Sequence, residues 1–488
     1  MKRLVFIMMI VMSVTGIIAQ NEVDALRYSQ SFYQGTARSM AMGNAFGALG
    51  ADFSSLSTNP AGLGLYRSSE FSITPEFFYK NTQSTYNGEV NDDSRSVLAI
   101  SNLGFVVTNK IPSGTTSAPW KYYQFAVGMN RTNNFNNNIL IEGDNHDHSK
   151  IDVYLDKAYG IDYQIIGDEN GNYTFDLFPA WYVYLLDTIP GFSDIYTSPV
   201  PQGGIRQREI IENRGSTNEW LFSAGANLND RVFFGATLGL PYLRYFRTST
   251  FSEYDVADTI PGFDEWTYKE NVTTIGWGVN LKLGVIVWPV DWLRLGAAFH
   301  TPSAFIELED FYSTTTSAQL GPDFNVKSSP NGEYTYDLTT PLKAIGSIGL
   351  IIGKYGLISG DYEFVDYSKT RLRAPDYTFT DENNAIKNSY QSTYNLRLGT
   401  EWRYTNFSFR GGYSLYGSPY ADKLNDGKLT SYSLGLGYTE GNIGIDLAWV
   451  HSQMKQDYYL YSSTNFTTNP TNQQMNANHF ALSIKSKF

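Results

Sequence analysis

Apolar and polar residues alternate along much of the chain, with the period of two that is typical of strands whose faces meet different surroundings. In the segment 273–288, apolar side chains from Ile275 to Val287 share one face, while glycines and Lys282 share the other. In the segment 95–108 the apolar residues do not keep one parity, which makes it the weakest of the strands. The predicted strands are 70–79, 95–108, 119–131, 218–229, 231–247, 268–288, 291–301, 334–353, 355–367, 389–404, 406–416, 428–440, 442–452 and 478–488.

The joins between these segments alternate between very short and long. Short joins lie at Asn229–Asp230, Pro289–Val290, Lys354, Tyr404–Thr405 and Glu440–Gly441. Long joins span 80–94, 132–217, 248–267, 302–333, 368–388, 417–427 and 453–477. Short turns on one rim and long loops on the other are typical of outer-membrane barrels. The predicted fold is all-β, a 14-stranded antiparallel transmembrane β-barrel over residues 70–488, with both ends on the periplasmic side and a long extracellular loop at 132–217.

The ends of the strands agree with this barrel. Trp288, Trp292, Tyr404 and Tyr438 lie at predicted strand ends, where an interfacial girdle of aromatic residues is expected. The last strand alternates and stops at Phe488, so we expect it to engage the barrel-assembly machinery. A soluble, secreted all-β protein is the alternative, but it does not account for the parity of the loop lengths.

The N-terminus has the pattern of a secretory signal peptide over residues 1–19. A short positive region precedes an apolar run from Leu4 to Val14, and Ala19 offers a cleavage point. After residue 20 the chain has no apolar stretch of about 18 residues, so no membrane-spanning helix is expected. The expected location is the bacterial outer membrane, with outer-membrane lipid around the barrel.

Composition narrows the classes of function. Of the 488 residues, 17% are charged, whereas soluble proteins carry about 25%. The absence of Cys excludes disulfides, CxxC zinc sites, iron–sulfur clusters and thiol nucleophiles. The formal net charge of −12 comes without a basic stripe, so nucleic acid is not expected as a partner.

Residues 20–69 precede the first strand and do not alternate. Small residues are dense between Gly35 and Ala51, and Asn59–Pro60 is a strong turn or break. These residues are predicted to pack as short helices inside the barrel and to form an N-terminal hatch or plug, with a floppy periplasmic tail as the alternative. The candidate residues of this hatch and of a ligand path are Phe46, Phe53, Leu56, Asn59, Pro60 and Leu63.

Several short motifs resemble one known family. They are Gly35–Ala37, Gly43–Ala45, Ala51–Asp52, the element Asn59–Leu63, and Gly360–Ser368. The first four are similar to the N-terminal hatch, and the last to a mid-barrel strand, of the FadL/TodX family of outer-membrane transporters. The resemblance implies a plugged fourteen-stranded barrel and uptake of hydrophobic small molecules, such as long-chain fatty acids or aromatic hydrocarbons. The long loop 132–217 departs from better-known members, so no ligand residue is carried across there.

The loop 132–217 contains the run Phe175–Leu186, which is too apolar for a solvated loop. One interpretation is that Phe178, Trp181 and Tyr184 form an extracellular capture surface for ligand. The other is that the run packs the loop onto the barrel rim.

Charged residues at lumenal positions of the strands are a second candidate group. They are Lys282, Arg294, Lys343, Asp361, Glu363, Arg397, Glu401, Arg410 and Asp446, of which Arg294, Arg397, Arg410, Asp361 and Glu363 are the chosen lumen charges. We expect them to pair with each other or with the hatch, because an unpaired buried charge is costly. The alternative is that one of the cations holds a carboxylate ligand.

The sequence favours neither an enzyme nor a metal or cofactor site. It has five His, of which His146 and His148 lie in an acidic stretch without an identifiable third ligand, and His300, His451 and His479 are catalytic candidates by position only. Two other functions remain open. One is a FadL-like barrel that acts as a scaffold or shuttle for secreted proteins, as PorV-like members of the wider family do. The other is a general porin, against which the apolar hatch argues.

Overall fold

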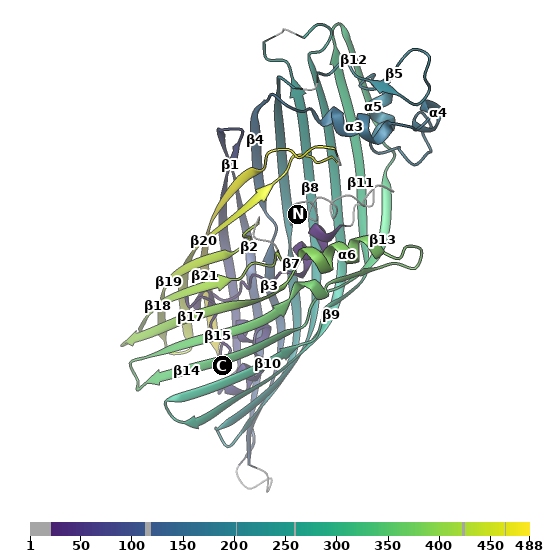
Figure 1. Ribbon diagram of the computed structural model, residues 1–488. Helices are drawn as coiled ribbons and strands as arrows, with labels where there is room; N and C mark the ends of the chain where they lie inside the picture. Colours follow the sequence, from purple (N-terminus) through teal and green to yellow (C-terminus); the bar gives the residue numbers. More distant parts are fainter. Residues whose placement is uncertain (1–20, 113–118, 202, 258–259, 422–424, 464) are drawn as a thin grey trace, which may run out of the picture.

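The computed structural model describes residues 21–112, 119–201, 203–257, 260–421, 425–463 and 465–488. The predicted signal peptide at 1–19 therefore lies outside the described residues. The sheet closes on itself, because β1 (Glu70–Tyr86) pairs with both β2 (Glu89–Lys110) and the last strand, β21 (Thr471–Lys487). Figure 1 shows the resulting barrel. Across the described residues, every helix is too short or too polar to span a bilayer.

The barrel is a closed, antiparallel structure of 14 spans, as predicted. Its other strands are β3 (Trp120–Asn134), β4 (Asn137–Asn145), β7 (Ile205–Leu228), β8 (Val232–Tyr254), β9 (Glu265–Val290), β10 (Leu293–His300), β11 (Ala304–Leu320), β12 (Asp323–Ser328), β13 (Gly332–Thr339), β14 (Lys343–Ile352), β15 (Gly356–Asp366), β17 (Ser392–Tyr404), β18 (Phe407–Tyr416), β19 (Leu429–Glu440) and β20 (Ile443–Tyr458). Some spans are built from consecutive strands, because β9 pairs with β10 near the periplasmic rim and with β11 above it.

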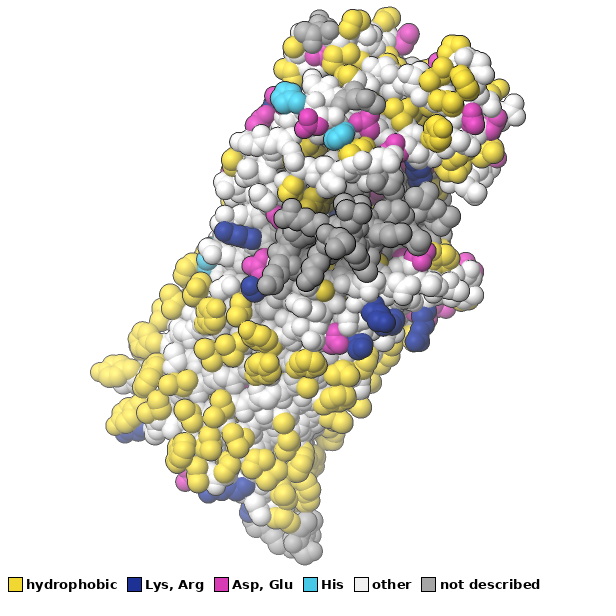
Figure 2. Space-filling view, in the orientation of Figure 1, with side chains coloured by type: hydrophobic (Ala, Val, Ile, Leu, Met, Phe, Trp, Pro, Cys, Tyr) yellow, Lys and Arg dark blue, Asp and Glu magenta, His cyan; other side chains and the backbone are white. Residues whose placement is uncertain are grey.

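Alternation along the strands separates an apolar outer surface from a polar lumen. On β9, Leu281 and Leu283 are exposed on the outside, whereas Lys282 between them is buried inside. Exposed apolar side chains gather over the lower part of the barrel in Figure 2, and most acidic side chains in view lie above them. A closed barrel satisfies its own backbone groups, so such a belt is stable in lipid. The chain therefore has the architecture of a bacterial outer-membrane protein.

Two segments predicted as long loops are mostly strand. β1 and β2 pair up to a tight turn at Asn87–Gly88, so the predicted loop 80–94 is wrong. β11 and β12 likewise pair up to the turn at Gly321–Pro322, inside the predicted loop 302–333. In 80–94 the buried face carries polar residues such as Thr82 and Ser84, so the apolar–polar alternation fades although the backbone ladder continues.

A bulge explains the weak alternation at 95–108. The register between β1 and β2 shifts at Thr74 and Pro75, and Ser101 is left without a partner in the ladder. Ser101 and the next residue, Asn102, are both buried on the lumenal side. Because a bulge inserts one residue, the residues on either side of it cannot share one parity.

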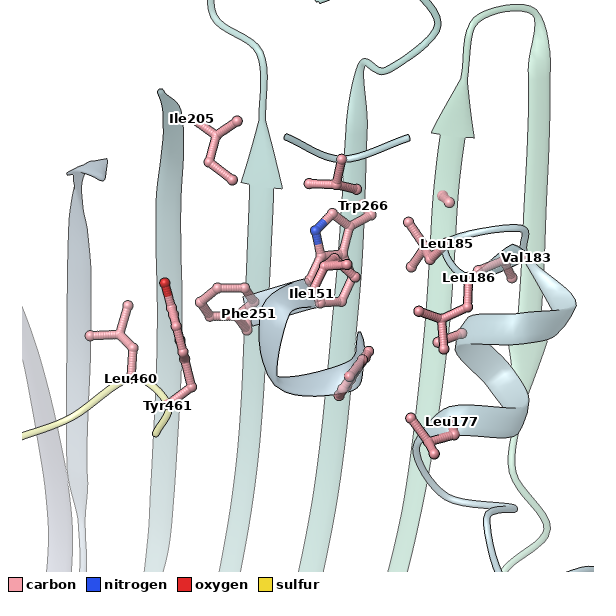
Figure 3. Packing of buried hydrophobic residues seen from close by; sticks show 14 of the residues in the cluster. Ile151, Leu177, Val183, Leu185, Leu186, Ile205, Phe251, Trp266, Leu460 and Tyr461 are labelled. Carbon is pink, nitrogen blue, oxygen red and sulfur yellow. The ribbon is translucent and has the colours of Figure 1, made fainter. Parts of the chain in front are cut away.

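The extracellular rim is uneven. Strands β7, β8, β9 and β11 form a tall wall, while β15 to β19 end lower (Figure 1). Residues 146–204, here named the extracellular lobe, pack against this wall. The lobe contains α3 (Lys150–Ala158), α4 (Tyr163–Ile166), α5 (Leu177–Tyr182), β5 (Asp187–Thr188) and β6 (Tyr196–Thr197). Figure 3 shows Leu185 and Leu186 of the lobe in the same cluster as Phe251 and Trp266 of the wall.

A buried carboxylate fixes the start of α3 on the wall. Glu253 of β8 accepts hydrogen bonds from the Ser149 hydroxyl (2.6 Å), the Lys150 backbone N–H (2.8 Å) and the Trp266 indole N–H (2.7 Å). Burial lowers the pKa of the Lys150 ammonium, which lies 4.6 Å from the centre of the Phe251 ring. The hydrogen-bonded carboxylate of Glu253 thus anchors the lobe to the wall inside a large apolar cluster.

On the low side of the rim, the segment after β15 forms η4 (Tyr367–Lys369), β16 (Arg371–Arg373) and α6 (Thr380–Ser389). Ile386 of α6 belongs to the same buried apolar cluster as Leu26, which lies in the N-terminal segment described below. The Tyr390 hydroxyl donates to the backbone carbonyl of Glu22 (2.9 Å). This segment therefore covers the N-terminal residues from above.

Candidate functional site

Residues 21–69, here named the lumenal segment, lie inside the barrel. They form α1 (Glu22–Ser29), α2 (Ala37–Ala41), η2 (Phe53–Ser57) and η3 (Pro60–Leu65). From residue 33 to residue 66 most side chains are buried. Because these residues pack against strands from every part of the wall, they fill the barrel rather than hang below it.

Glycines on the inner wall admit this segment. A Cβ atom at Gly104 or Gly128 would overlap the ring of Phe53, and one at Gly235 would overlap the backbone of Pro60. The predicted packing of short helices against inward glycines therefore has a direct steric reason. At these contacts the wall carries glycine, so no side chain keeps the lumenal segment away from the backbone of the strands.

Side-chain caps hold the short helices of the lumenal segment. The Asn59 carbonyl oxygen accepts from the Ala61 N–H (3.1 Å) at the start of η3, where Pro60 occupies the first helical position. The Asn59 amide donates to the carbonyls of Gly47 (2.7 Å) and Val285 (3.2 Å). One side chain thus caps a helix, joins two parts of the lumenal segment and ties both to β9.

A chain of buried ion pairs joins the lumenal segment to the wall. Its links are Arg38–Glu401 (2.8 Å), Glu401–Arg410 (2.7 Å), Arg410–Asp446 (2.6 Å), Asp446–Lys485 (3.0 Å) and Lys485–Asp52 (3.1 Å). Arg38 and Asp52 belong to the lumenal segment, and the others belong to four strands. Every charge in this chain meets an opposite charge, which offsets part of the cost of removing it from water.

The other lumen charges selected from the sequence also contact the wall or the lumenal segment. Arg397 pairs with Glu363 (3.0 Å), and Asp361 accepts from the Gly47 N–H (3.1 Å). The Arg294 guanidinium donates to the Leu49 carbonyl (3.2 Å). The arrangement fits the pairing interpretation for these residues.

The predicted hatch and ligand-path residues all lie in the lumenal segment. Phe46, Phe53, Leu56, Asn59, Pro60 and Leu63 are buried in its contacts with the wall. None of them lines either of the two lumenal cavities described next. They lie where the lumenal segment packs against the wall. Their role in a ligand path stays a prediction.

Two small cavities lie on either side of Tyr33. The first, of about 50 Å³, is lined by the end of α1, by the linker 30–34 that follows it, and by strands β3, β7 to β11 and β14. The second, of about 60 Å³, is lined by apolar residues such as Phe32, Met40 and Val450 together with polar residues such as Asn44 and His479. The linker is held to the wall by the Phe32 N–H to the Thr132 carbonyl (2.8 Å) and the Gln34 N–H to the Arg131 carbonyl (3.0 Å). The linker therefore separates the two cavities.

The first cavity contains an unusual lysine. Lys282 in its lining pairs with Glu219, but Lys343 has no acidic partner within ion-pair distance among the described residues. The Lys343 side chain is 8% exposed, and its ammonium lies 5.4 Å from the centre of the Tyr33 ring. The Asn280 carbonyl oxygen in the same lining is also without a hydrogen-bond partner. The cavity thus presents a buried lysine that forms no ion pair with an acidic residue of the described part of the chain.

Sequence reasoning placed Lys343 in the lumen but missed Glu219, Tyr33 and Asn280. Glu219 and Asn280 lie at lumenal positions of predicted strands, so strand parity offered a signal for both. Nothing in the sequence signalled Tyr33, because its position depends on how the linker crosses the barrel.

The predicted capture residues separate into different environments. Phe178 is buried, Trp181 is half-buried and stacks on Tyr163, and Tyr184 is exposed. In the run 175–186, Leu177, Val183, Leu185 and Leu186 are fully buried in the cluster on the tall wall. The interpretation that the run packs the loop onto the rim therefore accounts for most of it.

The histidines do not assemble into one site. His300 lies against the Thr58 carbonyl (2.8 Å), whereas His479 pairs with Glu76 (2.5 Å) on the strands where the barrel closes. His148 of the extracellular lobe stacks on Phe466, which lies between β20 and β21. Within the described residues, no group of three or more His, Asp or Glu side chains is arranged to hold a metal ion.

These features define a class: an outer-membrane β-barrel whose own N-terminal residues fill its lumen. No model of a protein family matches the chain, and no curated protein matches it. Solved structures do match. A FadL homologue from Pseudomonas aeruginosa has 12% sequence identity and a TM-score of 0.56, with 94% of this chain and 99% of that chain covered.

The toluene transporter TodX from P. putida gives the same identity of 12%, TM-score of 0.56 and coverage of 94% and 99%. At this identity the likeness concerns the fold. The resemblance to the FadL/TodX family is confirmed at that level: this chain has the fold of the FadL and TodX barrels.

Proposed function

We propose that this barrel takes up hydrophobic molecules that carry an anionic head group, with long-chain fatty acids as the leading substrate class. The observation that carries the proposal is Lys343, a buried cation that faces a lumenal cavity without an acidic partner among the described residues. The fold supports the transport part, since it is shared with a protein described as a toluene transporter.

A carboxylate suits the first cavity better than a plain hydrocarbon does. The lining combines Lys343 with several hydroxyl groups that can donate to a carboxylate, and its volume of about 50 Å³ has room for a head group rather than a tail. Charge-assisted hydrogen bonds contribute about 1.5–3 kcal/mol each. The second cavity, beyond the linker, has Phe32, Met40 and Val450 in its lining and is the proposed place for the start of an alkyl chain.

The backbone ladder of the wall is interrupted between β2 and β4. β2 and β3 pair only from Asn102 and Asn130 towards the periplasm, and above that point β4 pairs with β7 alone. Side chains bridge the opening instead, as in the bond from Arg95 to Asn138 (3.1 Å). Thr132, two residues beyond the last backbone pair, lines the first cavity. This opening is the proposed passage between the cavity and the membrane.

Two partners follow from the barrel itself. Lipid is expected to contact the apolar belt of Figure 2. β21 alternates and ends beside Phe488, whose ring centre lies 5.9 Å from that of Phe105, and we expect this strand to be recognised by the barrel-assembly machinery.

Replacing Lys343 with Met tests the proposal. Uptake of radiolabelled oleate by cells that carry the variant should fall by about tenfold or more, because loss of a charge-assisted contact costs about 1.5–3 kcal/mol. Uptake of toluene by the same cells should stay within about twofold, since toluene has no charge for Lys343 to bind.

Lys343→Arg is the matched variant, because it keeps the cation and should retain most oleate uptake. Equal losses for oleate and toluene would mean that the substitution disturbs the barrel. Unchanged oleate uptake by Lys343→Met would contradict the head-group site, while absence of uptake by the native chain would contradict transport itself.

A further inference from the structure

The extracellular lobe has two faces of different character. Its inner face is buried in the cluster on the tall wall. Its outer face exposes large side chains that contribute nothing to that cluster. This outer patch consists of Tyr159, Tyr163, Ile165, Tyr182, Tyr184 and Phe192. Soluble surfaces rarely gather such side chains without a binding role.

Hydrogen bonds and ring contacts make the outer patch continuous. The Gly160 N–H donates to the Asp194 carbonyl (2.9 Å), and the Tyr163 N–H donates to the Ser193 carbonyl (2.8 Å). Tyr163 also stacks on Trp181, with ring centres 5.9 Å apart. The three chain segments of the patch are therefore fixed side by side, and Figure 2 shows apolar and acidic side chains interspersed over the lobe.

The charge of the lobe is strongly one-sided. Residues 146–204 contain nine acidic and two basic residues, which gives −7 of the chain's formal −12. Both basic residues are engaged within the protein: Lys150 lies over the Phe251 ring, and Lys157 pairs with Asp176. Among the described residues, Asp162, Asp187 and Asp194 have no Lys or Arg partner within ion-pair distance. The outward charge of the patch is thus negative throughout.

One lysine of the chain already shows what this surface attracts. The Lys327 ammonium, on β12, lies 4.8 Å from the centre of the Tyr182 ring and 4.9 Å from that of Phe178. It also pairs with Glu169 (3.4 Å). A cation is thus held by two aromatic faces and a carboxylate at the edge of the outer patch.

We propose that the outer patch is a docking surface for a partner protein that presents Lys and Arg side chains. Tyrosine faces bind such cations and are enriched at protein interfaces, and the surrounding carboxylates steer a positive partner towards the lobe. A second copy of this chain is disfavoured, because two lobes of −7 repel each other. The membrane is not the occupant, since the lobe stands at the end of the barrel away from the apolar belt (Figure 2). This role is independent of transport through the barrel.

Peptide binding tests the proposal on the full chain in a neutral detergent. The probes are a fluorescent peptide of alternating Arg and Tyr and a matched peptide of alternating Glu and Tyr, followed by fluorescence anisotropy. The Arg peptide should bind at least about tenfold more tightly, and its affinity should fall as salt rises, because salt screens exposed charges. Equal affinity for the two peptides would overturn the proposal.

Variants locate the binding on the patch. Tyr159→Ser with Tyr184→Ser should weaken binding of the Arg peptide by about tenfold, as expected for losing about two cation–π contacts of ~0.5–1 kcal/mol each. Asp162→Asn, Asp187→Asn and Asp194→Asn together should flatten the salt dependence, and Asn keeps the helix cap that Asp162 provides.

Tyr355→Ser is the matched control, because Tyr355 is an equally exposed tyrosine at the opposite, periplasmic rim, beside Lys354. The Tyr355→Ser variant should bind the Arg peptide as tightly as the native chain does. Unchanged binding in the Tyr159 and Tyr184 variant would overturn the proposal. Self-association of the native chain that this same variant abolishes would assign the patch to a second copy instead.

Discussion

Two long segments without barrel strands pack against this barrel, one in the lumen and one on the tall extracellular wall, and they are held in different ways. The lumenal segment, 21–69, has three acidic and three basic residues, and its backbone approaches glycines of the wall closely. The extracellular lobe, 146–204, has a net charge of −7 and meets the wall through an apolar cluster centred on residues such as Trp266 and Leu185.

The difference indicates that the two segments are constrained to different degrees. Ion pairs and glycine contacts require a defined position, since a small shift leaves buried charges unpaired. An apolar cluster depends mainly on volume and tolerates more rearrangement. We therefore expect the lumenal segment to be fixed closely to the wall and the lobe to be the part that is loosened first.

Among these tests, removing Glu401 should lower the free energy of unfolding the most. Glu401 lies between Arg38 and Arg410, so Glu401→Ala leaves two buried cations without their shared partner. The free energy of unfolding in lipid vesicles, measured with urea, should fall by about 3–5 kcal/mol. Glu212→Ala breaks an exposed pair with Arg214 and should cost less than about 1 kcal/mol. Equal costs for the two variants would contradict the role of the ion-pair chain.

Truncating Leu185 tests the lobe in the same way. Leu185→Ala removes a fully buried side chain, and such cavities cost about 2–5 kcal/mol. The loss should be local, so limited proteolysis should cut within 146–204 sooner while the barrel remains intact. Tyr184→Ala alters the exposed neighbour and should leave the cutting rate unchanged. Simultaneous unfolding of lobe and barrel would show that the two segments are not independent.

Two neighbouring glycines of β18 provide the test with the smallest expected effect, which concerns the contact between the wall and the lumenal segment. A Cβ at Gly412 would overlap the backbone of Met42 and Gly43, whereas at Gly411 the nearest atoms are 3.9 Å away. Gly412→Ala should therefore cost about 1–3 kcal/mol through overpacking, and Gly411→Ala should cost much less. Urea unfolding measures both variants. If both are equally stable, the lumenal segment is not seated against β18.

Much of the barrel was predictable because lipid imposes a simple alternation. Leu281, Lys282 and Leu283 show the pattern that gave fourteen spans. The prediction failed where that constraint ends: 80–94 is strand, yet its buried side chains, such as Thr82 and Ser84, are polar like the exposed ones, so no apolar–polar alternation records it. Ser101 disturbs the pattern for another reason, because a bulge is set by the register of two strands and not by one strand's sequence.

The site was predictable in kind but not in detail. Strand parity placed Lys343 and Arg397 in the lumen, but only the packed structure distinguishes the paired Arg397 from Lys343, which has no acidic partner in the described part of the chain. The run 175–186 was read as either capture surface or packing, and burial of Leu185 and Leu186 supports packing. The outer patch was not predicted, because contacts between three separate segments of the lobe bring its residues together.

The central claim is that the lumenal segment closes the barrel to free passage of water and ions. Conductance of the full-length protein in a planar lipid bilayer tests this claim most directly. The lumenal cavities of about 50 and 60 Å³ are separate pockets, so we expect no steady stepwise conductance. A stable, ohmic open channel of the size seen in general porins would contradict the account.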